Sequence, residues 1–244
     1  MPSTHYTILP PSVPEDWTSL AGLATLKSLV TSSLPFKPRD FQLYDSACIL
    51  NGQDLFCISA TGNGKSALIY IPALVRPHTI TVVVEPTNFL EEAMAENLRA
   101  KGLMSVVINR DTLLKATLEG QDLWQEARAC KYQIIALSPE LLRSPEFSVM
   151  ISTPYFRALW RVLAIDEAHL TDKWGADFRP LYEDIWSIRP CGPEHLTVVA
   201  LSASVEPEGQ TRHILQHLGF TEGTYHMDQR DCEHRNMDLV FRTV

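Results

Sequence analysis

Residues 59–66 carry the side chains and the backbone freedom needed to hold a chain of phosphate groups. They read Ser-Ala-Thr-Gly-Asn-Gly-Lys-Ser and follow a short apolar run. Gly62 and Gly64 allow the backbone to curl so that successive N–H groups point at phosphate oxygens. Lys65 adds a positive charge for the β- and γ-phosphates, and the Ser66 hydroxyl suits a Mg²⁺ ion. A strand, a glycine-rich turn and a helix that begins at Lys-Ser predict a phosphate-binding loop; a chance Lys-Ser after a glycine turn is the alternative.

A second chemical feature is the acidic pair that follows the apolar run Arg161–Ile165. Asp166 and Glu167 would lose hydration at the end of a buried strand unless a cation or a nucleophile uses them. Beside a phosphate loop, Asp166 would help to hold Mg²⁺, largely through water, and Glu167 would orient and activate the attacking water. The alternative is that the pair forms the solvated start of a helix.

The elements that must position these residues follow from the hydrophobic pattern. A helical period runs through Trp17–Val30 and Arg39–Leu50. Beyond them, short apolar runs rich in β-branched residues alternate with helical segments. The runs are Asp54–Ser59, Thr79–Val84, Met104–Ile108, Tyr132–Leu137, Arg161–Ile165 and Leu196–Leu201, and the helical segments include Lys65–Val75, Asn88–Lys101 and Glu206–Leu218. This pattern predicts an α/β fold with a mostly parallel sheet, helices on both faces, and ligands beyond the carboxyl ends of the strands.

The composition limits the class of protein. The 244 residues are 45% hydrophobic, which is enough for a sizeable core, and the net charge of −8 means that any nucleic-acid contact must be local. Five cysteines without a CxxC pair favour a reduced intracellular protein over a disulfide framework or a zinc site. Neither a signal peptide nor an apolar stretch of about 18–20 residues is present, so no membrane span is expected. We expect an irregular tail at 1–14, one domain at 15–235, and a linker or edge strand at Asn236–Val244.

Several short motifs occur along the chain in the order of a known family. The sequence resembles the first RecA-like domain of superfamily 2 helicases, which are P-loop NTPases, and within them the DEAH-type RecQ family of DNA helicases. The motifs that carry the resemblance are Pro38–Gln42, the loop at 59–66, Val82–Thr87, Leu137–Glu140, Asp166–His169 and Leu201–Ser204. Together they cover nearly the whole chain and are far more specific than any one of them.

The resemblance implies ATP and Mg²⁺ as cofactors and assigns roles to individual residues. The implied ATP-binding residues are Arg39, Gln42, Thr61, Gly62, Asn63, Gly64, Lys65 and Ser66, with Gln42 pairing with the adenine edge. The implied catalytic residues are Lys65, Asp166, Glu167 and His169, and the implied metal-binding residues are Ser66 and Asp166. His169 would sense a second RecA-like domain. For Gln42, an ordinary place on a helix surface is the alternative.

Three positions depart from the usual motifs. Ser59 stands where the general phosphate-loop pattern has Gly, although many helicase loops read AxTGxGKS. Glu85 stands where the family usually has Ser or Thr, and its carboxylate would repel a DNA phosphate. Ser204 replaces Thr at the end of the last motif and keeps a hydroxyl for a linking hydrogen bond.

Residues 173–182, KWGADFRPLY, look like the aromatic-rich loop of RecQ helicases. Aromatic faces stack on unpaired bases with about 1–3 kcal/mol per base, so Trp174 and Phe178 could bind single-stranded DNA. Arg179 could attract a neighbouring phosphate. The alternative is that these aromatic side chains pack on the domain. The residues expected to contact DNA are Thr87, Asn88, Ser138, Trp174, Phe178 and Arg179.

The resemblance therefore implies the ATP-binding domain of a 3′–5′ DNA helicase, which acts on single-stranded DNA or on a single-strand/double-strand junction. A second RecA-like domain would supply an arginine finger worth about 10³–10⁵ in rate, so this chain alone should bind ATP with almost no turnover. A non-catalytic nucleotide- or nucleic-acid-binding relic and the core domain of an RNA helicase are the alternatives, and the aromatic loop argues against the RNA helicase. The family also implies a nuclear location.

Overall fold

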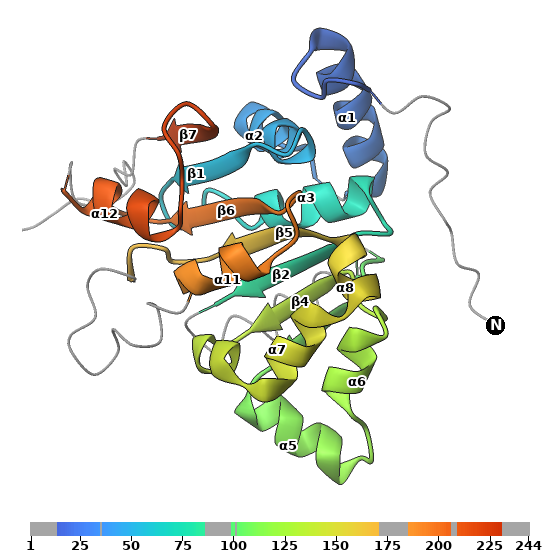
Figure 1. Ribbon diagram of the computed structural model, residues 1–244. Coiled ribbons are helices and arrows are strands. Elements are labelled where there is room, and N and C mark those ends of the chain that lie inside the picture. Colours follow the sequence, from blue (N-terminus) through green and yellow to red (C-terminus); the bar gives the residue numbers. More distant parts are fainter. Residues whose placement is uncertain are drawn as a thin grey trace, which may run out of the picture.

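Seven parallel strands form one sheet at the centre of the computed structural model, which describes residues 14–34, 36–85, 99–100, 102–170, 185–205 and 209–230 (Figure 1). In space the strands lie in the order β3-β4-β2-β5-β6-β1-β7. Their bounds are β1 Asp54–Ile58, β2 Ile80–Val84, β3 Ser105–Ile108, β4 Ile134–Leu137, β5 Trp160–Ile165, β6 Thr197–Ser202 and β7 Tyr225–Gln229. The predicted parallel sheet is confirmed, and the six predicted runs correspond to β1–β6.

The parallel register brings the carboxyl ends of the strands to one edge of the sheet. Leu163 of β5 is paired with Val198 of β6, and Val199 of β6 is paired with Leu55 of β1. Strand β6 therefore lies between β1 and β5, and the loops that follow these three strands leave the sheet side by side. Because ligands of such sheets bind beyond the carboxyl ends, this edge is where the functional residues are expected.

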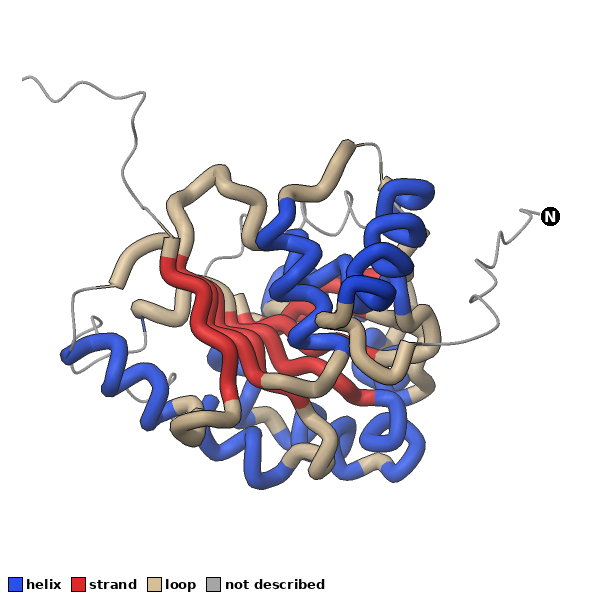
Figure 2. Tube along the Cα trace, turned by 90° about the horizontal axis from the view of Figure 1, so that it is seen from above, coloured by secondary structure: helices blue, strands red, loops and turns tan. Residues whose placement is uncertain are grey.

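Helices cover both faces of the sheet, as the view along its edge in Figure 2 shows. On one face lie α1 Leu20–Ser33, α2 Asp40–Leu50 and α3 Ala67–Val75. The other face carries α5 Arg110–Leu118, α6 Leu123–Arg128, the 3₁₀ helix η1 Pro139–Arg143, α7 Pro145–Ser152, α8 Pro154–Leu159, α11 Ile185–Cys191 and α12 Gly209–His217.

Alternating strand residues feed two apolar cores, one on each face. Val82 and Val84 belong to the core under α5–α8, α11 and α12, whereas Val83 belongs to the core under α1–α3. Since side chains alternate along a strand, a run such as Val82–Val84 must be apolar throughout to serve both cores. This explains why β1–β6 appear in the sequence as continuous apolar runs.

Strand β7 was not predicted, because its sequence Tyr-His-Met-Asp-Gln lacks an apolar run. It pairs with β1 at the edge of the sheet and is partly exposed. The edge strand expected at Asn236–Val244 lies outside the described residues, as do most of the helix expected at Asn88–Lys101 and most of the tail at 1–14. Within the described residues, no helix is long and apolar enough to cross a membrane.

Polar contacts hold β7 against α2. The Asp45 side chain is only 1% exposed, and its Oδ1 lies 3.3 Å from Nε2 of His226. Burial, followed by the charge of Asp228 and a hydrogen bond to it, raises the pKa of Asp45 to about 8. Arg230 lies over the Phe41 ring, 4.3 Å from its centroid, and forms an ion pair with Asp228. At neutral pH, therefore, the Asp45–Asp228 pair retains a proton inside the α2–β7 contact.

Asp45→Asn should flatten the pH dependence of stability. The folded-state pKa of about 8 exceeds the ordinary value, so between roughly pH 4 and pH 8 the folded chain binds a proton that the unfolded chain does not. This group therefore makes the free energy of unfolding fall as pH rises through that window. Urea unfolding at about pH 6 and about pH 9 should show a smaller fall for Asp45→Asn than for the wild type. The exposed Asp111→Asn is the control, and equal falls in all three proteins would contradict the account.

Candidate nucleotide-binding site

The loop at residues 59–66 joins the end of β1 to the start of α3. Gly62 and Gly64 both have a left-handed backbone, with φ of +84° and +81°. A Cβ on Gly64 would lie 2.7 Å from Nε2 of Gln42, whereas one on Gly62 would meet no atom within 4 Å. Gly62 is therefore required by its backbone angle alone, and Gly64 by its angle and by the close approach of a neighbouring side chain.

Lys65 lies inside this loop. Its side chain is 9% exposed, and Nζ donates hydrogen bonds to the carbonyl oxygens of Ser59 at 2.7 Å and Ala60 at 3.3 Å. Ser59, the residue that replaces glycine, accepts a hydrogen bond at Oγ from Nδ2 of Asn63 at 3.0 Å. The side chain at position 59 thus fastens the loop on itself. Ser66 is exposed, and its side chain makes no capping hydrogen bond to α3.

Gln42 joins the start of α2 to the loop, and it is 4% exposed. Its Oε1 accepts a hydrogen bond from the backbone N–H of Arg39 at 2.8 Å, and its Nε2 donates to the carbonyl of Gly64 at 2.9 Å. The Arg39 guanidinium donates to Oδ1 of Asn63 at 3.1 Å. The predicted adenine-recognition residues are thus in direct contact with the predicted phosphate loop. Gln42 is not the ordinary surface glutamine of the alternative interpretation.

The acidic pair stands at the end of β5, on the same edge of the sheet. The backbone N–H of Asp166 donates to the carbonyl of Val84 at 3.0 Å, and its Oδ1 accepts from the N–H of Glu167 at 2.9 Å. Burial raises the pKa of Asp166, and the charge of Glu167 adds to this, while the hydrogen bond from the Glu167 N–H and the charge of Lys65 oppose it. The two predicted groups of residues therefore interact electrostatically, as a shared ligand site requires.

His169 connects the acidic pair to β6. Its Nδ1 lies 3.2 Å from Oε2 of Glu167 and 3.0 Å from Oγ of Ser202, the last residue of β6. The Ser202 hydroxyl in turn donates to the carbonyl of Ser204 at 2.9 Å. The linking hydrogen bond expected in this motif is thus present, but the Ser202 hydroxyl makes it and Ser204 contributes its backbone oxygen. Glu167 has a φ of +49°, an uncommon value for a residue with a side chain, and its conformation is held by these neighbours.

Ser202 and Gln210 were not predicted as site residues. Gln210, on α12, donates from Nε2 to the carbonyl of His169 at 3.3 Å. The backbone of β6 also fastens both loops, since Ser59 N–H donates to Ser202 O at 2.9 Å and Ala168 N–H donates to Leu201 O at 2.8 Å. No local sequence signal marks these contacts, because they join residues far apart in the chain.

The residues expected to contact DNA are mostly not described. Ser138 follows β4 and is 2% exposed, so its side chain does not lie on the surface. Glu85, at the end of β2, is likewise 2% exposed. The remaining residues expected at the DNA interface, Thr87, Asn88, Trp174, Phe178 and Arg179, lie outside the described residues.

Comparison with known proteins gives the family. The family model described as DEAD/DEAH box helicase matches residues 39–212, which include Arg39 and Gln42, the loop at 59–66 and the acidic pair. The chain belongs to the DEAD/DEAH box helicase family.

Among curated members of this helicase family, the chain is similar to RecQ proteins, and the resemblance stated from the motifs is confirmed. It is 32% identical to the ATP-dependent DNA helicase RecQ of Haemophilus influenzae over 69% of this chain and 26% of that protein. It is 32% identical to RecQ of Bacillus subtilis over 64% and 25%, and 30% identical to the ATP-dependent DNA helicase Q5 of Mus musculus over 67% and 16%. The chain spans about a quarter or less of the length of these relatives.

Solved helicase structures share the fold. The helicase MrfA, solved bound to DNA and AMPPNP, matches 91% of this chain and 30% of its own with a TM-score of 0.65 at 15% identity. A hypothetical ATP-dependent RNA helicase from Sulfolobus tokodaii matches 84% of this chain and 56% of its own, with a TM-score of 0.58 at 18% identity. These matches identify the RecA-like helicase fold and, at such identities, nothing finer.

Gly64→Ala should destabilise the helicase domain more than Gly62→Ala. Both substitutions force a side chain into the left-handed region at about 1–2 kcal/mol, but only the methyl group at 64 meets the buried Gln42 amide. Urea unfolding should therefore show a larger loss for Gly64→Ala, and the excess should shrink when Gln42→Ala is also present. The cost of Gly62→Ala should be the same in both backgrounds. An excess that persists without Gln42 would contradict the steric argument.

Proposed function

We propose that residues 15–235 form the ATP-binding, first RecA-like domain of a RecQ-like, ATP-dependent 3′–5′ DNA helicase. The observation that carries the proposal is the convergence of two motifs at one edge of the sheet. The loop at 59–66 and the pair Asp166–Glu167 follow strands β1 and β5. The end of β6 accepts hydrogen bonds from Ser59 of the loop and from Ala168, directly after the pair. A phosphate chain in the loop would have its terminal group beside the acidic pair.

The residues at this edge fit ATP with Mg²⁺. The left-handed glycines curl the loop so that its N–H groups can donate hydrogen bonds to phosphate oxygens. The Lys65 ammonium group already lies within the loop, where it donates to the Ser59 carbonyl. The exposed Ser66 hydroxyl and the Asp166 carboxylate offer the hard oxygen ligands that Mg²⁺ prefers. When bound, the metal would neutralise charge on the β- and γ-phosphates. The raised pKa of Asp166 would fall beside such a cation.

Glu167 is the residue best suited to orient the attacking water. It adjoins the metal-binding Asp166, and His169 lies 3.2 Å from its carboxylate. Since Ser202 holds the same imidazole, the Glu167 side chain is linked to the end of β6. A movement of β6 would therefore change the position of the proposed general base, Glu167. His169 and Ser202 act in this scheme as positioning residues for Glu167.

DNA is the proposed polynucleotide. The curated relatives named above are DNA helicases, and the segment 173–182 has the aromatic residues and the arginine that stack on bases and bind phosphates. The core domain of an RNA helicase has the same fold, so the fold does not discriminate between the two nucleic acids. We assign the stacking role to Trp174 and Phe178 on their residue types. A nuclear location stays a prediction, because the relatives include bacterial proteins.

Turnover would require a second RecA-like domain, because an arginine finger from that domain is worth about 10³–10⁵ in rate. A non-catalytic relic of a helicase would share the ATP-binding residues, so nucleotide binding alone cannot separate the two proposals. A measurement of ATP hydrolysis separates the helicase domain from the non-catalytic relic.

Lys65→Ala should weaken ATP–Mg binding by at least about tenfold, because the buried ammonium that pairs with the phosphates is lost. Titration with a fluorescent ATP analogue measures the affinity. Lys115→Ala, which removes an exposed lysine on α5, is the control with the same change of charge and should bind like the wild type. Equal affinities for all three proteins would exclude the loop at 59–66 as the phosphate site.

Single-turnover assays on the same chain, with and without single-stranded DNA, then test the chemistry. Slow hydrolysis that Glu167→Gln abolishes supports a catalytic helicase domain whose full turnover requires a second RecA-like domain. Binding without any hydrolysis supports the relic. Rapid, DNA-stimulated turnover by this chain alone would contradict the requirement for a second domain.

A further inference from the structure

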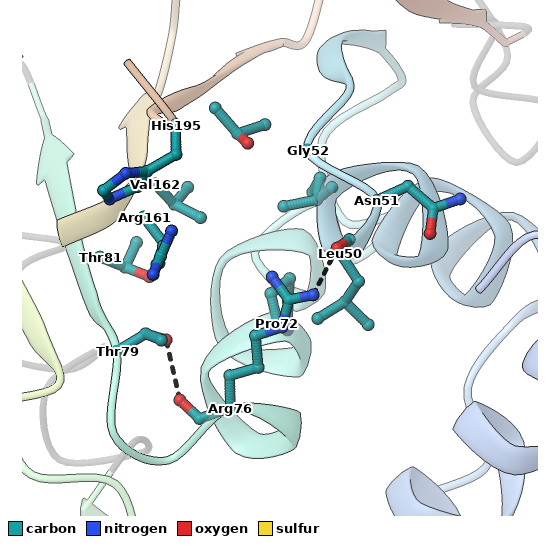
Figure 3. A pocket seen from close by; sticks show the side chains of 12 residues that line it. Leu50, Asn51, Gly52, Pro72, Arg76, Thr79, Thr81, Arg161, Val162 and His195 are labelled. Atoms are coloured by element: carbon teal, nitrogen blue, oxygen red, sulfur yellow. Dashed lines mark hydrogen bonds between the residues drawn. The ribbon is translucent and has the colours of Figure 1, made fainter. Parts of the chain in front are cut away.

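A polar cavity lies at the amino-terminal ends of the strands, on the opposite side of the sheet from the proposed nucleotide site at their carboxyl ends. It has a volume of about 240 Å³ and is surrounded by the end of α2, the end of α3 and the amino-terminal ends of β2, β5 and β6 (Figure 3). Since the loop at 59–66 follows the carboxyl end of β1, the whole length of the sheet separates the two sites.

The titratable groups that line the cavity are all basic, and they lie among neutral residues such as Leu50, Pro72 and Val162. Arg76, Arg161 and His195 are its only titratable lining residues, and no carboxylate lines it. In the described part of the chain, neither arginine forms an ion pair; Arg76 instead donates a 2.6 Å hydrogen bond to the carbonyl of Leu50. Figure 3 shows Arg161 and His195 at the strand side, while Arg76 enters from the end of α3. Such a grouping is unexpected in a chain with a net charge of −8.

These groups interact with one another. Burial lowers the pKa of Arg76, and the charge of Arg161 lowers it further. Burial also lowers the pKa of His195, followed by the charge of Arg161, while hydrogen bonds to the backbone of Trp160 and Arg157 oppose this. Like charges held together without a counter-ion destabilise their charged forms, and an anion among them removes that cost.

The cavity is suited to a small oxyanion. Its volume is below the roughly 300–1,000 Å³ of pockets for drug-sized ligands, which favours a small ligand. Guanidinium groups match the geometry of phosphate oxygens and bind them with paired hydrogen bonds. Two acidic residues adjoin lining residues without lining the cavity themselves: Glu194 is exposed and precedes His195, and Asp16 accepts a hydrogen bond from the Asn51 amide.

We propose that this cavity binds a phosphate group, free or as a monoester, between Arg76, Arg161 and His195. The threonine hydroxyls at the start of β2 complete a polar lining. The site is separate from the nucleotide site, and its occupation does not depend on the chain's being a helicase domain. Phosphate would then bind at the amino-terminal ends of the strands, away from the proposed ATP site.

The imidazole NMR signal of His195 reports occupation directly, and His195→Gln assigns it. Inorganic phosphate is titrated against chloride at constant ionic strength. The proposal predicts a saturable shift of this signal in the wild type. Arg161→Gln should weaken the affinity by about tenfold or more, and Arg161→Lys, which keeps the charge but loses the fork, should weaken it less. Arg110→Gln removes an exposed arginine on α5 and should leave the affinity unchanged.

Lys65→Ala separates this cavity from the nucleotide loop, which also attracts phosphate. A saturable shift that survives Lys65→Ala and is weakened by Arg161→Gln supports the proposal. A shift lost in Lys65→Ala but retained in Arg161→Gln, or a shift that never saturates, overturns it. Glucose 6-phosphate in place of inorganic phosphate then identifies the source: tighter binding of the sugar phosphate indicates a monoester, and weaker binding indicates the free anion.

Discussion

The alignment of β1, β6 and β5 as neighbouring parallel strands is the constraint on which the site depends. Parallel pairing makes their carboxyl ends coincide at one edge, and β6 stands between the two loops that carry the chemistry. Its last two carbonyls accept the N–H groups of Ser59 and Ala168. The phosphate loop and the acidic segment are therefore fastened to the same strand end. Without that strand they would be two isolated motifs.

The end of β6 also contacts the side chains of the acidic segment. The Ser202 hydroxyl is hydrogen-bonded to His169, and the His169 ring lies at ion-pair distance from Glu167, so a path of polar contacts runs from the sheet to the proposed general base. On the other side of the loop, Gln42 uses both atoms of its amide to hold Gly64 against α2. The site is thus held from two directions.

Local sequence was sufficient for the features that local geometry determines. The turn with left-handed glycines at 59–66, between a strand and a helix, could be predicted from its glycines and the Lys-Ser that follows. Strands β1–β6 could be predicted because strands buried on both faces are largely apolar. Strand β7 could not be predicted, because its polar residues face α2 and its sequence therefore contains no apolar run. The contact of His169 with Ser202 arises because β5 and β6 are neighbours in the sheet. The grouping of Arg76 with Arg161 and His195 arises because the end of α3 lies beside the amino-terminal ends of these strands, and residues so far apart in sequence do not reveal this.

A crystal structure of this chain with a non-hydrolysable ATP analogue and Mg²⁺ tests the central claim most directly. The account predicts phosphate oxygens within hydrogen-bond distance of the loop amides and of Lys65 Nζ. It also predicts the metal between the Ser66 hydroxyl and the Asp166 carboxylate, directly or through water. An analogue bound away from the loop at 59–66, or a metal without any link to Asp166, would contradict it.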